Sequence, residues 1–181
     1  MTGLHRASVS FRAARLVATL LIAVGAPGSG RADVAREDAM PLAEFPREPL
    51  VVETRSARRH TFDAWRADTP RAREQGLMFV THLEPDRAMF FVYDPPARVS
   101  MWMKNTLIPL DMLFVDRGGC VTMVKLDAQP ESLDLIRSPD AVALVVELAG
   151  GAATRLGIAV GDRVRRPAIG WPAQAFPCGG G

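Results

Sequence analysis

The chain has 181 residues, of which 48% are hydrophobic and 23% are charged, with 22 Lys and Arg against 20 Asp and Glu. This composition fits one globular domain and excludes both a disordered polyelectrolyte and a strongly basic nucleic-acid binder. Aromatic residues make up only 7%, and Tyr93 is the only tyrosine, which argues against a carbohydrate-binding surface built from many stacked rings.

Residues 1–32 have the pattern of a secretory signal peptide. Three arginines precede an apolar run at residues 16–26, and the small residues Gly30 and Ala32 favour cleavage after Ala32. The alternative is a membrane anchor, but the run is much shorter than the roughly 20 residues that span a bilayer. Cleavage removes four arginines and no acid, which leaves 18 basic and 20 acidic residues, a net charge of −2. We therefore expect a periplasmic or secreted protein with no nucleic-acid partner and no stable membrane insertion.

The rest of the chain predicts a mainly β fold, a compact antiparallel barrel or sandwich with two short helices. Residues 33–49 are expected to form a linker, residues 50–165 the domain, and residues 166–181 an irregular tail. Thr69 and Pro70 predict the start of one helix, which Gly76 ends, and residues 151–156 predict the other. The nearly continuous apolar run 141–148 predicts a strand buried on both faces. The other strands are expected at residues 50–54, 60–65, 88–93, 100–108, 110–115, 120–126 and near Val164.

The segment Met101-Trp102-Met103-Lys104-Asn105-Thr106-Leu107-Ile108-Pro109-Leu110-Asp111 is distinctive, and we call it the signature segment. It resembles the signature of the domain-of-unknown-function 192 family of small, often exported prokaryotic proteins. Three more blocks follow the order that this family shows: residues 73–78, residues 146–150, and residues 156–158 leading to Gly161-Asp162. The resemblance covers residues 60–164 and implies a compact, mostly β, barrel-like fold. It implies no activity.

The signature segment could form a ligand site. On an extended strand, Trp102, Lys104 and Thr106 would share one face, and Met101, Met103 and Asn105 the other. An aromatic ring beside an ammonium and a hydroxyl could hold a small polar or anionic ligand. The alternative is structural: Lys104 would pair with Asp111 across the bend at Pro109, and Asn105 would bond the backbone.

Two residues outside the segment are further candidates. Arg73 could clamp a carboxylate or phosphate, or it could complement the C-terminus of its short helix. Glu147 lies inside the apolar run that ends at Leu148, so its carboxyl either bonds a neighbouring group or lies in a cavity with a shifted pKa. Together these residues predict a binding module for a small polar or anionic molecule, with Trp102, Lys104, Asn105, Thr106, Asp111, Arg73 and Glu147 at the site.

Two other functions stay open. Lys104 with Asp111 or Glu147 could serve as the acid/base pair of an enzyme. Met101 and Met103 could bind Cu(I), since thioethers suit that ion, although methionine also fills cores. The sequence shows neither a hydrolase nucleophile motif nor a zinc-ligand spacing, and it predicts no cofactor.

The two cysteines, Cys120 and Cys178, are a candidate pair. Export would place them in an oxidising compartment, where disulfides persist. A bond between them would tie the Pro- and Gly-rich tail to the domain, whereas too great a distance would leave both as thiols.

Overall fold

The computed structural model describes residues 35–172 and residue 178. These residues belong to one unit, Asp33–Gly181. The expected signal peptide, residues 1–32, lies outside them, and so do residues 33–34, 173–177 and 179–181. Within the described part, no helix has the length and apolar character needed to cross a membrane.

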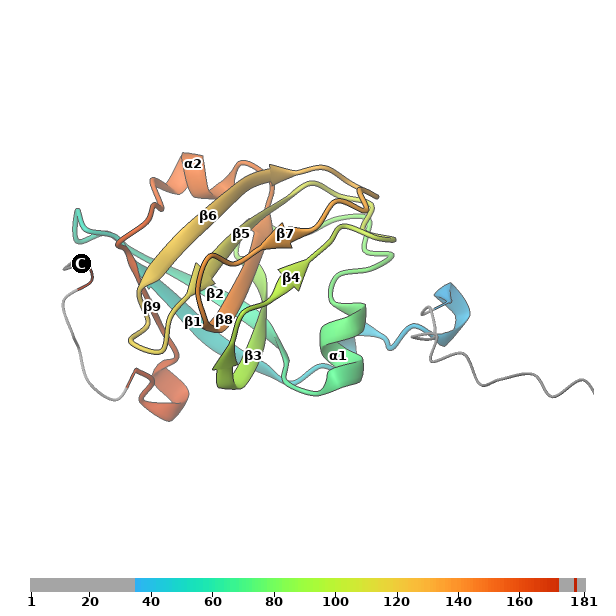
Figure 1. Cartoon of the computed structure of the whole chain (residues 1–181), viewed down its shortest axis with the longest axis horizontal. Coiled ribbons are helices and arrows are strands. Elements are labelled where there is room, and N and C mark those ends of the chain that lie inside the picture. The colour runs from blue at the N-terminus through green and yellow to red at the C-terminus, as the bar shows by residue number, and fades with distance from the viewer. Residues whose placement is uncertain (1–34, 173–177, 179–181) are drawn as a thin grey trace, which may run out of the picture. The chain divides into compact units, whose positions relative to one another are not determined.

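Seven of the nine strands in the described chain form one curled sheet with the strand order β6-β5-β8-β3-β2-β1-β9 (Figure 1). In chain order the strands are β1 (Arg47–Glu53), β2 (Arg59–Ala67), β3 (Arg87–Ala97), β5 (Leu110–Val115), β6 (Val121–Ala128), β8 (Val142–Ala149) and β9 (Arg163–Arg165). A second sheet pairs β4 (Ser100–Met101) with β7 (Ile136–Arg137). The α-helices are α1 (Pro70–Gln75) and α2 (Ala152–Leu156), and the 3-10 helices are η1 (Arg36–Asp38), η2 (Leu42–Glu44) and η3 (Pro167–Ile169). The mainly β class is confirmed.

The pairing of β2 with β3 departs from a wholly antiparallel sheet. These two strands run parallel, whereas the other neighbours in the main sheet are antiparallel. The connection between β2 and β3 contains α1, which brings the chain back so that both strands run in the same direction.

The two edge strands of the sheet meet at one end. Cys120, just before β6, forms a bridge with Arg163 of β9. The Val121 N–H donates to the Asp162 carbonyl at 2.8 Å, and the Val164 N–H donates to the Gly119 carbonyl at 2.8 Å. These bonds close the sheet locally into a barrel-like curl and satisfy edge groups that would otherwise be unpaired.

Each face of the sheet carries its own hydrophobic cluster. The inner cluster includes Phe62, Phe90 and Leu113 together with Ala152 and Ala153 of α2, and the outer cluster is covered by α1 and by the start of the signature segment. The outer cluster includes Ala72, Met89, Phe91, Met101, Met103, Met112 and Phe114. Residues 142–148 of β8 are all buried, which confirms the strand that was expected to be covered on both faces.

The start of α1 follows the predicted chemistry. The Thr69 Oγ1 accepts a hydrogen bond from the Ala72 N–H at 3.1 Å, and Pro70 occupies the first turn. Gly76 ends the helix with a φ of +52°, a value that L side chains rarely adopt. A Cβ on Gly76 would also lie 3.0 Å from the Phe91 ring, so glycine lets the turn pack against β3.

Two predicted boundaries were wrong. The strand expected at residues 100–108 covers only Ser100–Met101, and the signature segment continues as a loop until β5 begins at Leu110. The first strand begins at Arg47 rather than Leu50, because the backbone of Arg47–Pro49 pairs with β2, and Phe45 is buried just before it.

The disulfide between Cys120 and Cys178 is present, with a Cα–Cα distance of 5.3 Å. It joins the residue before β6 to the chain beyond η3, so the predicted attachment of the tail is confirmed.

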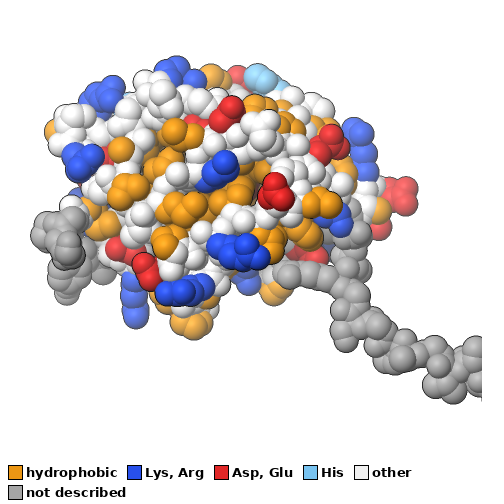
Figure 2. All heavy atoms as spheres, turned by 45° about the horizontal axis from the view of Figure 1, so that its top comes forward, with side chains coloured by type: hydrophobic (Ala, Val, Ile, Leu, Met, Phe, Trp, Pro, Cys, Tyr) orange, Lys and Arg blue, Asp and Glu red, His pale blue; other side chains and the backbone are white. Residues whose placement is uncertain are grey.

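The surface carries charges of both signs. Figure 2 shows one face, where hydrophobic side chains lie among Lys, Arg, Asp and Glu, and neither charge dominates. Large hydrophobic side chains that are exposed in the described part include Leu107, Leu126, Leu133 and Leu135. This view gives no sign of the continuous basic surface that binds nucleic acid.

Candidate functional site

The signature segment is a loop held by backbone hydrogen bonds. The Met103 N–H donates to the Ser132 carbonyl at 3.0 Å, and the Glu131 N–H donates to the Thr106 carbonyl at 3.0 Å. The Thr106 N–H donates back to the Met103 carbonyl at 3.0 Å and closes a turn. The segment is therefore not the extended strand that was expected, although Trp102, Lys104 and Thr106, which were expected on one face, do line one cavity.

Between this loop and α1 lies a cavity of about 20 Å³, which we call the signature recess. Five of the seven predicted site residues line it: Arg73, Trp102, Lys104, Thr106 and Glu147. The other lining residues are Glu74, Gln75, Gly76, Leu77, Met78, Phe91 and Met101. The recess therefore combines the signature segment, the residue 73–78 block and β8, which are far apart in the sequence.

Glu147 is the buried polar group of the recess. Its cross-strand neighbours are Met89 on β3 and Met112 on β5, and only 4% of its surface is exposed. Its Oε2 has no hydrogen-bond partner among the described residues. Burial raises the pKa of Glu147 to about 8, because an apolar environment disfavours the charged carboxylate. At pH 7 the group is therefore mostly a neutral carboxylic acid, which can both donate and accept a hydrogen bond.

Lys104, Trp102 and Thr106 bring polar and aromatic groups to the recess. The Lys104 Nζ lies 5.4 Å from the centroid of the Trp102 ring, within the range of a cation–π interaction. Both side chains are half-buried, whereas Thr106 is buried. The Thr106 Oγ1 donates to the Lys104 carbonyl at 3.4 Å. The aromatic ring, ammonium and hydroxyl that the sequence predicted together do lie around one cavity.

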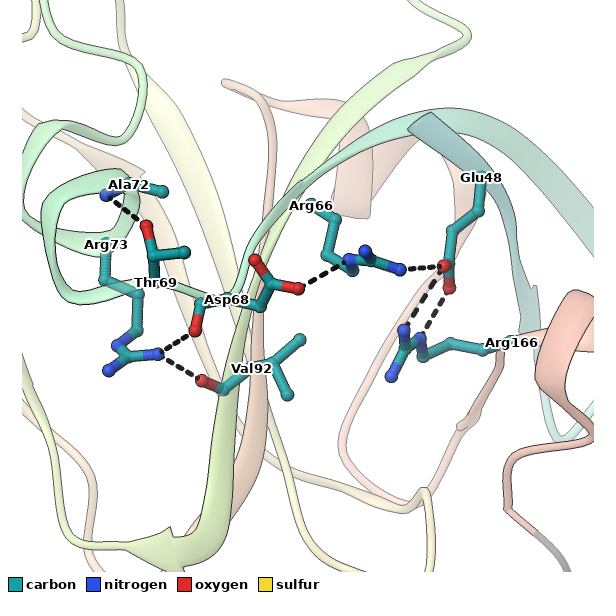
Figure 3. A network of polar contacts seen from close by, with 8 residues as sticks. All are labelled: Glu48, Arg66, Asp68, Thr69, Ala72, Arg73, Val92 and Arg166. Carbon is teal, nitrogen blue, oxygen red and sulfur yellow. Dashed lines mark hydrogen bonds and ion pairs between the residues drawn. The ribbon is translucent and has the colours of Figure 1, made fainter. Parts of the chain in front are cut away.

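Arg73 has a positioning role that the sequence left open. Its Nη1 donates to the carbonyl of Asp68 at 2.8 Å and to that of Val92 at 3.0 Å (Figure 3). Its guanidinium carbon lies 5.5 Å from the Tyr93 ring centroid. Arg73 thus ties α1 to β3, and that nitrogen is already engaged by the protein, so a bidentate clamp on a ligand is not its observed arrangement.

Asp111 and Asn105 lie outside the recess. Asp111 is fully buried, and its two carboxyl oxygens accept from the N–H groups of Asp127 and Ala153, each at 2.8 Å. The second bond fixes the first turn of α2, so Asp111 maintains the fold. Asn105 has a φ of +56°, and its carbonyl accepts a hydrogen bond from the Phe79 N–H at 2.8 Å. This agrees with the structural alternative to ligand binding, in which Asn105 bonds the backbone.

The two methionines of the signature segment, Met101 and Met103, are buried rather than exposed to a ligand or metal. Met101 is 7% exposed and Met103 is 1% exposed, and both belong to the outer cluster. The Met101 Sδ accepts a hydrogen bond from the Tyr93 hydroxyl at 3.6 Å. A copper site at the surface would need both sulfurs accessible, so the geometry contradicts that alternative. No group of three His, Cys, Asp or Glu residues suited to a metal occurs in the described ranges.

Tyr93 is a neighbour of the recess that sequence reasoning missed. It contacts both Arg73 and Met101, and burial, partly offset by Arg73, raises the pKa of its hydroxyl to about 12. The signal for it was present, because Tyr93 is the only tyrosine and stands at the end of the strand expected at residues 88–93. What the sequence lacked was any indication that this strand lies under the signature segment.

The arrangement can recognise one small polar group and can exchange a proton. The Glu147 carboxyl supplies an unpartnered acceptor and, when protonated, a donor. A carboxyl with a pKa near 8 also matches the proton-transfer range of a general acid at neutral pH.

Comparisons with known proteins agree with this fold. A candidate transcription regulator from Sinorhizobium meliloti 1021 is 39% identical with a TM-score of 0.67, over 68% of this chain and 95% of that one. A protein of unknown function from Novosphingobium aromaticivorans DSM 12444 is 35% identical with a TM-score of 0.67, over 70% of this chain and 90% of that one. No curated protein matches the chain. The sequence profile of DUF192, the domain-of-unknown-function 192 family described as "Uncharacterized ACR", matches residues 51–166, and the chain belongs to this family.

Proposed function

We propose that the protein is an exported binding module that holds a small polar or anionic ligand at the signature recess. The observation that carries this proposal is Glu147, a buried carboxyl with an unpartnered oxygen that lines a cavity beside Lys104 and Thr106. A buried polar atom without a partner costs about 1–3 kcal/mol, so a ligand group that supplies the partner recovers free energy on binding.

The size of the recess limits how the ligand is bound. A cavity of about 20 Å³ has room for one group of the size of a water molecule. One polar group of the ligand therefore enters toward Glu147, and the rest of the ligand lies against Trp102 and Lys104, which are half-buried at the recess. The ring offers stacking and the ammonium offers a charge-assisted hydrogen bond.

The charge of the recess favours a polar or anionic group over a cation. Arg73 and Lys104 are cationic, Glu147 is mostly neutral at pH 7, and Glu74 is the other acidic residue in the lining. A neutral carboxyl donates a hydrogen bond to an anionic oxygen without the repulsion that a carboxylate would cause.

Export is the second part of the proposal. The signal-peptide pattern of residues 1–32 and the disulfide between Cys120 and Cys178 both support an oxidising compartment. A nucleic-acid role, which the description of the Sinorhizobium relative raises, is not supported by the net charge of −2 that remains after residue 32.

A thermal-shift screen tests the proposal. The purified protein is heated with acetate, citrate, inorganic phosphate, glucose and AMP, and every hit is repeated on Lys104→Ala and Glu147→Gln. Lys125→Ala is the matched control, because Lys125 is the other lysine of the chain and lies on β6, outside the recess. We expect hits that weaken in both recess variants and persist in the control. Hits that respond identically in all four proteins would contradict the site.

The raised pKa of Glu147 favours a second candidate function, acid/base catalysis with Lys104 as the partner group. The same screen separates the two functions if each hit is incubated with the protein and followed by NMR. A binding module leaves the hit unchanged. An enzyme converts it, and Glu147→Gln then abolishes conversion while binding remains detectable.

A further inference from the structure

A second and much larger hollow lies away from the signature recess. It has a volume of about 750 Å³ and we call it the end groove. Its walls come from the end of β3, the start of β8, the turn between β5 and β6, and the segment around η3. The lining residues that matter below are Val92, Leu144 and Trp171 on the apolar walls, and Asp94, Arg117 and Arg166 among the charged groups. Pockets for small molecules usually measure about 300–1,000 Å³, so this groove has the size of a ligand site.

Arg166 gives the groove a rigid cationic group. It is 7% exposed, and its Nε and Nη2 donate to the two carboxyl oxygens of Glu48 at 2.6 and 3.2 Å. Its guanidinium carbon also lies 4.9 Å from the centroid of the Phe90 ring. Figure 3 shows the third nitrogen of Arg166 pointing away from the contacts with Glu48. A guanidinium fixed on one edge keeps a donor in place at little entropic cost to a ligand.

The aromatic wall of the groove is also fixed. Arg166 and Trp171 form a backbone bridge, with N–H to carbonyl distances of 2.7 and 3.2 Å, so the η3 turn holds Trp171 in place. A Cβ on Gly119 would lie 2.8 Å from the Val164 carbonyl and 3.0 Å from Pro172, so only glycine allows this close approach. The disulfide of Cys120 adjoins the same corner.

The lining combines apolar walls with two arginines and one carboxylate. Arg117 is exposed on the turn between β5 and β6, Arg166 is paired with Glu48, and Asp94 is the one acidic residue of the lining. Apolar walls and two arginines match a molecule that has one anionic end and one apolar end.

We propose that the end groove binds a small organic carboxylate with an apolar body. Arg166 and Arg117 hold the carboxylate, and the body lies against Trp171 and the side chains of Val92 and Leu144. This site is separate from the signature recess and does not depend on the function proposed for it.

Isothermal titration with hexanoate tests the proposal on the purified, oxidised protein. Acetate has the charge without the apolar body, and hexanamide has the body without the charge. We expect hexanoate to bind more tightly than either control. Arg117→Gln should lower the affinity for hexanoate about fivefold, which is the loss expected when an ion pair near the surface is removed. Arg155→Gln is the matched control, because Arg155 is exposed on α2 and does not line the groove.

A second readout follows Trp171 directly. Hexanoate should change the tryptophan fluorescence of the wild type and of Lys104→Ala, and the change should be lost in Trp171→Phe. Absent binding, equal affinity for hexanoate and hexanamide, or equal affinity in Arg117→Gln and Arg155→Gln would each overturn the proposal. Lys104→Ala removes a group of the signature recess and none of the end groove. The response of this variant therefore distinguishes a failure of the end-groove proposal from a failure of the recess proposal.

Discussion

Two buried carboxyls on neighbouring strands have opposite surroundings. Asp111 on β5 faces the inner side of the sheet, and Glu147 on β8 faces the outer side, one residue away in the register of the two strands. Asp111 accepts two backbone N–H groups at 2.8 Å, whereas the Oε2 of Glu147 has no partner in the described part of the chain. The first carboxyl holds the fold together, and the second has an oxygen that the described part of the protein leaves without a hydrogen bond.

The difference shows that burial alone does not identify a site. Both side chains are nearly inaccessible, with 0% and 4% of their surface exposed. What separates them is the number of donors that the protein itself supplies, because a satisfied carboxyl gains nothing from a ligand whereas an unsatisfied one does.

The largest expected effect is a pH dependence that belongs to Glu147. Its pKa rises from 4.5 in the unfolded chain to about 8 in the folded protein, so between these values the folded state binds more protons. Stability therefore falls as pH rises across this window and levels off above it. A shift of this size corresponds to roughly 5 kcal/mol. Urea unfolding of the wild type and of Glu147→Gln from pH 4.5 to 9 should show the two free energies diverging, and parallel curves would mean that Glu147 ionises normally.

The second prediction concerns Asp111, whose carboxyl oxygens both accept hydrogen bonds from the backbone. Asp111→Ala should lower the unfolding free energy by about 3 kcal/mol, because the N–H groups of Asp127 and Ala153 lose their acceptor and the second of these is buried. Urea titration at pH 7 with the disulfide intact measures this. Asp140→Ala is the control, since Asp140 makes only an exposed ion pair with Arg98 and should cost about 0.5 kcal/mol. Equal losses in the two variants would refute a structural role for Asp111.

Glu147→Met should stabilise the protein at pH 7 by about 1 kcal/mol. Methionine has a similar volume, packs next to Met89 and Met112, and buries no unpaired polar atom. Thermal unfolding of the variant and the wild type checks the sign. A lower melting temperature would show that the carboxyl has a partner that stabilises the fold.

The smallest effect is expected at Asn105, whose backbone is in the left-handed region. Asn105→Gly should change stability by no more than about 0.5 kcal/mol, whereas Asn105→Ala should cost about 1 kcal/mol, because alanine tolerates a positive φ poorly. Neither variant should alter a ligand shift measured at the signature recess. If Asn105→Gly abolished that shift, Asn105 would be part of the site after all.

Local patterns predicted the elements whose causes are local. Thr69 and Pro70 mark the start of α1 because the cap and the first turn lie within a few residues, and the apolar run of β8 marks a buried strand wherever it pairs. The signature segment was misjudged because its alternating side chains resemble a strand, although residues 103–106 form a turn with Lys104 and Asn105 at its centre.

Contacts between residues far apart in the chain could not be predicted from the sequence. The acceptor role of Asp111 depends on the N–H groups of Asp127 and Ala153, which are 16 and 42 residues away. The sequence placed Glu147 correctly among the site candidates, but the missing partner of its Oε2 follows only from the packing of β3 and β5 on either side.

The strand order has a consequence for how the chain folds as it emerges. Strand β8 lies between β3 and β5, and β9 near the C-terminus pairs with β1, the first strand in the chain. A chain that emerges N-terminus first, whether from a ribosome or from a translocation channel, cannot complete the sheet until residue 165 is available. The segments before β8 cannot bury all of their apolar side chains until β8 is available, which makes completion of the final structure a late, cooperative event.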